Sequence, residues 1–224
     1  MRDDKAEEFF QQLVDEYERE DRDVLSRLQR TDGVLQTARD ALAQVASPGL
    51  LIKAVSAQEF MQQVRETQKL PPEMSEFISR VVSAIRIATV FGVAATQALQ
   101  SIRNQADGFD DWWEPHSKRL QEDPLARTFW LLRNVLLHQG HAGLTFAKLD
   151  AYNQADGTAV FIAPRFSGVT VKLLTQQQAE EPALILTQRY IETVDAILAE
   201  AWSIWVPTAV RGKRGVGRIH FLER

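Results

Sequence analysis

The residues best suited to chemistry are Arg133, Asn134 and His138, which lie in the strongly apolar run 129–138. An imidazole titrates near neutral pH and can therefore take up or release a proton in a reaction. A guanidinium keeps its charge and presents a fork of donors that fits an anion. Arg133 cannot reduce the cost of burial by losing its proton. A carboxylate, a second subunit or a phosphate must therefore face it.

These three residues share one face of a predicted helix over residues 124–139. At about 100° per residue, the arc that holds them also holds Arg127, Trp130 and Leu137. The opposite arc is apolar and is expected to pack into a core, and its members are Phe129, Leu131, Leu132, Val135 and Leu136. Asp123 is the expected N-cap, Pro124 the first helical residue and Gly140 the stop.

One interpretation of the polar face requires no ligand. A buried polar group without a partner costs roughly 1–3 kcal/mol. The acids Asp107, Asp110 and Asp111 precede the helix and could satisfy the cluster within the chain. In that case the arrangement would be structural.

Arg133-Asn134 followed by His138 has the form R-N-x-x-x-H, which resembles the R-x4–6-H signature of HEPN-domain proteins. The stretch FDDWWEPHSKRLQEDPLARTFWLLRNVLLHQG also resembles a segment of uncharacterised bacterial HEPN-like proteins, and this close similarity covers about 32 residues. Arg214 and His220 fit the same spacing, but they lie in a Gly-rich tail without helical periodicity.

The resemblance implies an all-α bundle that dimerises with two motif helices across a two-fold axis. It further implies a metal-independent endoribonuclease, with no cofactor expected. In this interpretation Arg133 binds the scissile phosphate and stabilises the charge that builds on it. His138 moves a proton at the ribose 2′-OH or the leaving 5′-oxygen, and Asn134 orients these groups. Attack by the 2′-OH would leave a 2′,3′-cyclic phosphate and restrict cleavage to RNA.

The same resemblance suggests a toxin or antiviral-defence nuclease that acts as a homodimer on RNA. A neutralising antitoxin or a regulatory protein would then be a further partner. Some family members have lost catalysis, so a non-catalytic HEPN-like module that binds RNA or protein is an alternative. A third hypothesis is an unrelated helical scaffold whose Arg–Asn–His cluster locks a dimer seam.

Further substrate contacts are expected from Arg127 and His141. Arg127 shares the motif face, although it could instead pair with Glu122 or Asp123. His141 follows the helix stop and could equally be a solvated cap. The basic tail could bind phosphates by charge, through Arg211, Lys213 and Arg214. Trp112 and Trp113 are expected to be core anchors, with base stacking as the alternative.

Composition limits the function classes. The chain has 224 residues and no cysteine, which excludes thiolate metal sites, iron–sulfur clusters, a cysteine nucleophile and disulfides. The net charge is −4, with +4 in residues 207–224 and −8 in the remainder. The acidic, amphipathic start does not resemble a signal peptide, so a cytoplasmic protein is expected. His116 is the one histidine near the acids of residues 107–114, so no metal site is expected.

The expected fold is mainly α: a helical bundle of HEPN type with a small antiparallel β meander inserted before the last long helix. We divide the chain into a helical region (1–70), a HEPN-like core with the motif helix (71–142), a β meander (143–175), a closing helix (176–206) and a basic tail (207–224). Expected helices cover residues 3–30, about 34–45, 57–67, 72–101, 110–120, 124–139 and 184–205. Expected strands cover 144–152, 159–166 and 169–174.

Two features of the expected helices matter for the fold. Residues 31–33 (Thr-Asp-Gly) predict a break between the first two helices. The apolar segment 87–102 falls short of the ~20 residues that span a bilayer and is expected to be a buried helix. We therefore expect no membrane contact.

Overall fold

A computed structural model describes residues 24–45, 47, 49–53, 62, 65–67, 69, 71–139, 143–145, 149–154 and 157–206. It is mainly helical, with a small antiparallel β region before the last long helix, as the sequence predicts. In chain order the elements are α2 (Val24–Ala43), β1 (Leu50–Lys53), α4 (Pro72–Leu99), η1 (Gln100–Ile102), α5 (Phe109–Glu122), α6 (Pro124–Gln139), β2 (Leu144–Thr145), β3 (Leu149–Gln154), β4 (Gly157–Ile162), β5 (Arg165–Phe166), η2 (Thr170–Leu173), α7 (Gln176–Glu180) and α8 (Ala183–Trp205).

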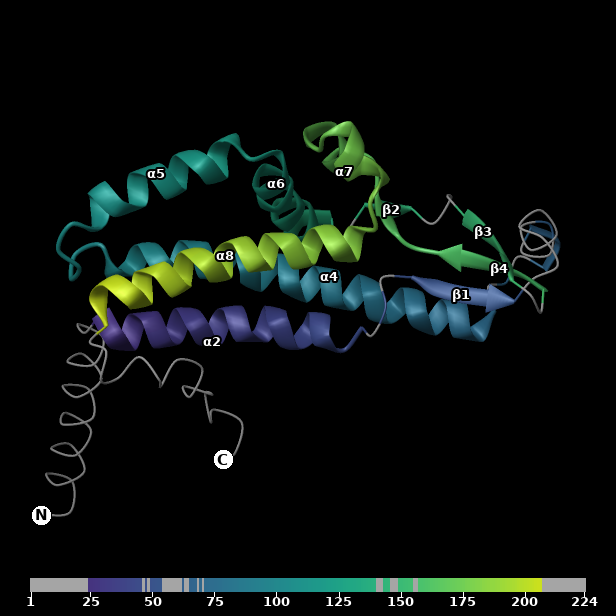
Figure 1. Cartoon of the computed structure of the whole chain (residues 1–224), viewed down its shortest axis with the longest axis horizontal. Helices are drawn as coiled ribbons and strands as arrows, with labels where there is room; N and C mark the ends of the chain where they lie inside the picture. Colours follow the sequence, from purple (N-terminus) through teal and green to yellow (C-terminus); the bar gives the residue numbers. More distant parts are fainter. Residues whose placement is uncertain are drawn as a thin grey trace, which may run out of the picture.

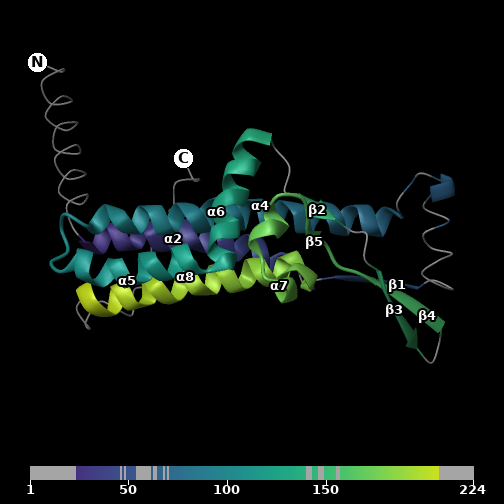
Figure 2. The ribbon, with the colours of Figure 1, turned by 90° about the horizontal axis from the view of Figure 1, so that it is seen from above.

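Three long helices, α2, α4 and α8, run side by side along the molecule, with α2 opposite in direction to the other two (Figure 1). The strands lie near one end of this bundle, and α5 lies towards the other end (Figure 1). Helix α6 crosses the long helices instead of running along them, and its C-terminal end projects beyond them (Figure 2). The predicted motif helix is therefore packed on the bundle at its start and leaves the bundle at its end.

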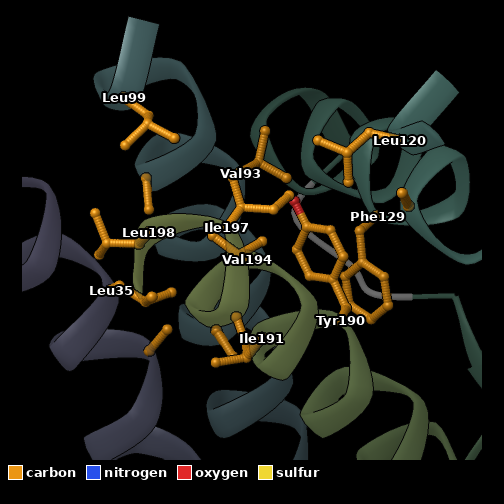
Figure 3. Close-up of a cluster of buried hydrophobic side chains, with 14 of the residues drawn as sticks. Leu35, Val93, Leu99, Leu120, Phe129, Tyr190, Ile191, Val194, Ile197 and Leu198 are labelled. Carbon is orange, nitrogen blue, oxygen red and sulfur yellow. The ribbon is translucent and has the colours of Figure 1, made fainter. Parts of the chain in front are cut away.

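Helix α6 is anchored to the core where it meets α8. The ring of Phe129 stacks on that of Tyr190 with a centroid distance of 4.4 Å and an interplanar angle of 2°. Both residues are fully buried, among aliphatic side chains of α4 and α8 (Figure 3). The same face of α6 buries Leu132 and Leu136. Burial of two aromatic rings and several aliphatic chains fixes which side of α6 faces inward.

Helix α4 is the central helix of the bundle. With η1 it forms Pro72–Ile102, the one segment of the described chain that is long and apolar enough to cross a membrane by length and composition alone. It packs against α2, α6 and α8. Its inward face is lined with fully buried side chains, including Val81, Ile85 and Val93. This packing accounts for the apolar side chains on its inward face.

The predicted break at residues 31–33 is wrong, because α2 runs without interruption through them. The buried carboxylate of Asp32 pairs with Arg39 at 3.4 Å, and Arg39 also bonds Asp195 on α8. The hydroxyl of Thr31 donates to the carbonyl of Arg27 at 2.9 Å. A helical glycine such as Gly33 costs only about 1 kcal/mol, which these interactions and the packing of α2 offset.

The β region differs from the expected meander in three ways. Segment 169–174 contains the 3-10 helix η2 instead of a strand, and the hydroxyl of Thr170 donates to the carbonyl of Ser167 at 2.7 Å. The strand β1 was not expected, and it pairs antiparallel with β4 in a sheet ordered β1-β4-β3. Strands β2 and β5 form a separate two-stranded pair. Region 1–70 is thus not purely helical.

The remaining helix predictions agree with the structure where it describes them. Helices α4, α5, α6 and α8 begin and end within a few residues of their predicted bounds. Residues 3–23 and most of 57–67 lie outside the described residues, although 62 and 65–67 are helical. The tail, 207–224, also lies outside them.

Gly92 tests the close approach of α4 to α8. A Cβ at this position would lie 2.5 Å from Cδ1 of Ile191 and 3.0 Å from Cε1 of Tyr190. The Tyr190 ring cannot yield easily, because it is stacked on Phe129. We expect Gly92→Val to lower the free energy of unfolding by about 1–3 kcal/mol through overpacking, measured by urea denaturation. The matched change Ser83→Val, at an exposed position of α4, should cost much less. Equal losses in both variants would contradict the close contact.

Candidate functional site

The start of α6 is fixed by local signals that the sequence predicts correctly. The carboxylate of Asp123 accepts a hydrogen bond from the backbone N–H of Leu125 at 2.9 Å, as an N-cap does. Pro124 is the first helical residue, where its missing N–H is not needed. The helix ends at Gln139, one residue before the predicted stop.

The polar face of α6 points away from the core. Arg127, Asn134 and His138 are exposed, and Arg133 is half-buried. Trp130 and Leu137 are 39% and 58% exposed, and they are two of the five exposed large apolar side chains in the described chain. We call this face the α6 stripe, and its members are Arg127, Trp130, Arg133, Asn134, Leu137 and His138. The structure thus places the three predicted catalytic residues on one face that points away from the core, with Asn134 and His138 exposed and Arg133 half-buried.

Arg133 has no internal partner in the described part of the chain. Its Nε atom is buried and makes no hydrogen bond there. Of the acids that could have satisfied it, Asp110 pairs with Arg103 at 2.7 Å. No ion pair joins Arg133 to Asp107 or Asp111 among the described residues. The interpretation as an internally satisfied polar cluster therefore finds no support in the described residues.

Arg127 does not pair with Glu122 or Asp123 within the described residues, and the Asp123 carboxylate is used as the helix cap. Arg127 lines a cavity of about 380 Å³ between α5, α6 and η2. The other lining residues are Ser117, Leu120, Gln121, Trp130 and Leu173. The sequence did not predict this cavity, because its walls come from three elements. The only local signal was the spacing of Arg127 and Trp130, which places them about one turn apart.

Trp112 and Trp113 are anchors of α5, as expected. Both are half-buried, and Trp113 stacks on Phe109 with a centroid distance of 6.0 Å. The indole N–H of Trp112 donates to Glu200 of α8 at 2.8 Å, and its ring lies edge-on to Trp205. These contacts hold α5, one wall of the cavity, against α8.

The Glu200 carboxylate of α8 takes part in this contact between α5 and α8. The hydrogen bond from Trp112 lowers the pKa of the Glu200 carboxyl, and His116, whose Nε2 lies 3.3 Å away, adds to this effect. Burial raises this pKa; its influence is weaker than that of the Trp112 hydrogen bond and stronger than that of the His116 hydrogen bond. On α8, burial raises the pKa of the Tyr190 hydroxyl, so this group stays neutral beneath α6.

The other predicted contact residues lie outside the described residues. These are His141 and the tail residues Arg211, Lys213 and Arg214. Within the described residues, no group of three or more His, Asp or Glu side chains is placed to hold a metal ion. The described part of the candidate site therefore consists of the α6 stripe and the adjoining cavity.

The chain matches no protein-family model, no curated protein and no solved structure. What the fold and the site define is a mainly helical bundle whose crossing helix carries an uncovered Arg–Asn–His face. The function is therefore argued from the chemistry of the α6 stripe.

Replacing Arg133 by an apolar side chain tests whether this cation serves stability. Because its buried Nε has no partner, we expect Arg133→Met to leave the free energy of unfolding unchanged or to raise it by up to about 1 kcal/mol. The matched variant Arg39→Met removes a cation that is paired with Asp32 and Asp195 and should cost about 1–3 kcal/mol. Urea denaturation at several protein concentrations measures both and separates folding from assembly. A loss above about 2 kcal/mol in Arg133→Met would indicate an internal structural partner.

Proposed function

We propose that this protein is a metal-independent endoribonuclease of HEPN type that acts as a cytoplasmic homodimer. The observation that carries the proposal is the α6 stripe: a guanidinium, an amide and an imidazole on one uncovered helix face. Arg133 is half-buried and makes no ion pair within the described residues, and a phosphate oxygen is the acceptor that a guanidinium fits best.

The chemistry follows from the side chains. Arg133 holds the scissile phosphate, and Asn134 orients the phosphate or the imidazole. The ribose 2′-oxygen loses its proton to a base and attacks phosphorus, while the bond from phosphorus to the 5′-oxygen breaks. An acid protonates that 5′-oxygen, so the products are a 2′,3′-cyclic phosphate and a 5′-hydroxyl. The reaction needs one base and one acid, and two copies of His138 in a dimer supply both.

The shape of α6 supports the dimer. Its C-terminal end projects beyond the long helices (Figure 2), and Leu137 is 58% exposed there beside His138. Trp130, seven residues earlier on the same helix face, is also exposed. Exposed apolar surface rimmed by polar groups favours a surface that another molecule covers. A second α6 stripe would cover Leu137 and bring two copies of Arg133 and His138 together.

A second candidate function is a non-catalytic module that binds RNA or protein. The observation in its favour is the exposure of Trp130 and Leu137, which suits binding and contributes nothing to proton transfer.

In the catalytic proposal the biological setting is a toxin or antiviral-defence nuclease, silenced by a neutralising antitoxin or a regulatory protein.

Cleavage of RNA in the presence of EDTA tests the catalytic proposal. We expect the wild type to cut RNA with chelator present and to leave 2′,3′-cyclic phosphate ends. His138→Ala should lower the cleavage rate by about 10²-fold or more, the scale of a lost general acid or base. The control His116→Ala removes the histidine that contacts Glu200, outside the α6 stripe, and should retain the activity.

One result would contradict the catalytic proposal. If the purified dimer leaves tRNA, mRNA and rRNA uncut and its expression does not harm a host cell, the enzyme interpretation must be abandoned. RNA binding without cleavage, unchanged in His138→Ala, would favour the second candidate function.

Leu137→Glu tests the dimer separately. In the proposed dimer the two α6 stripes face each other across the two-fold axis, and a residue near that axis lies close to its own copy. Leu137→Glu therefore introduces two facing charges. We expect the dimer dissociation constant to rise by about 10²-fold or more, the effect of desolvated like charges, and RNA cleavage to fall with it. Analytical ultracentrifugation measures the association. Ile204→Glu, at a position of α8 that is 50% exposed, is the matched control and should not change it. A monomeric wild type would contradict the composite site.

A further inference from the structure

The cavity beside the α6 stripe has the size of a small-ligand site. It measures about 380 Å³ and lies between α5, α6 and η2, within the range of roughly 300–1,000 Å³ typical of ligand pockets. The N-terminal half of the stripe, Arg127 and Trp130, forms one wall. The C-terminal half, from Arg133 onward, does not line the cavity.

The lining combines three kinds of chemistry. Trp130 contributes an indole that is 39% exposed, and Leu120 and Leu173 add apolar surface. Arg127 is the one charged lining residue, and its side chain makes no ion pair or hydrogen bond within the described residues. The amide of Gln121 donates to the hydroxyl of Ser117 at 3.1 Å, which leaves the amide oxygen as an acceptor.

An aromatic surface, an unpaired cation and a hydrogen-bonding edge together fit one class of ligand. A flat heteroaromatic ring stacks on an indole, and an attached phosphate matches the guanidinium. A purely apolar ligand would leave Arg127 without a partner. A simple anion would leave Trp130 and the two leucines unused.

The position of the cavity links it to the proposed reaction. At about 1.5 Å per helical residue, Trp130 lies about 4.5 Å and Arg127 about 9 Å along the axis from Arg133. We infer that the cavity is a subsite for one nucleotide of the RNA, with its base on Trp130 and its phosphate on Arg127. This inference rests on the proposed function, and it adds a fixed position for a base next to the bond that is cut.

The subsite is tested by nucleotide binding, without any RNA cleavage. The full-length protein is titrated with the four nucleoside 3′-monophosphates and, in parallel, with the four nucleosides. Binding is followed by NMR through the indole N–H signal of Trp130. The chain has five tryptophans, and the signal that is missing from the NMR spectrum of Trp130→Phe identifies Trp130. We expect this signal to shift on nucleotide addition and the nucleosides to bind more weakly by about tenfold or more, since they lack the phosphate.

Three variants and a matched control test the residues that line the cavity. Arg127→Ala should weaken nucleotide binding by about tenfold or more, and Trp130→Ala by about five- to 100-fold, measured by calorimetry. Leu173→Trp fills the cavity from η2 without altering α6 and should abolish binding. Arg86→Ala, which removes an exposed cation of α4, should have no effect.

The outcomes separate the subsite from the proposed function. Nucleotide binding that depends on Arg127 and Leu173 supports the subsite, even if no RNA is cut, in which case the nuclease proposal alone fails. Cleavage that persists unchanged in Leu173→Trp, with no nucleotide bound at millimolar concentration, overturns the subsite and leaves the nuclease proposal intact. Binding that Arg127→Ala and Leu173→Trp do not alter also overturns it.

Discussion

The stacking of Phe129 on Tyr190 determines which way the α6 stripe faces. The two rings lie parallel, 4.4 Å apart and fully buried, at the crossing of α6 over α8. Gly92 of α4 leaves the space that this pair and its neighbours occupy. Since successive helical residues are rotated by about 100°, an inward Phe129 requires Trp130, Arg133 and the rest of the stripe to face outward.

Elements with local signals could be predicted from the sequence, and elements that depend on distant partners could not. Helix α6 was predicted to within a residue, because its cap, its first proline and its apolar arc all lie within it. The continuity of α2 was missed, because it is stabilised by the contact of Arg39 with Asp195 on α8. Strand β1 was missed for the same reason, since its partner β4 lies in the second half of the chain.

The candidate site shows the same division. Periodicity alone placed Arg133, Asn134 and His138 on one face, and the structure agrees. The cavity next to that face was not predicted, because residue 173 was assigned to a strand and the distance of α5 from α6 cannot be derived from periodicity. A pattern on one helix therefore predicted a face, whereas the cavity requires three elements to meet.

Stability does not explain the composition of the α6 stripe. An exposed tryptophan and leucine add little to a core, and a buried guanidinium N–H without a partner opposes folding. These groups nevertheless occupy a helix whose other face is among the best packed in the molecule. A rigid inner face holds the outer side chains in place, which is what a binding or catalytic surface requires. We therefore propose that the composition of the outer face reflects binding: an anion at Arg133, a flat ring at Trp130 and an apolar surface at Leu137.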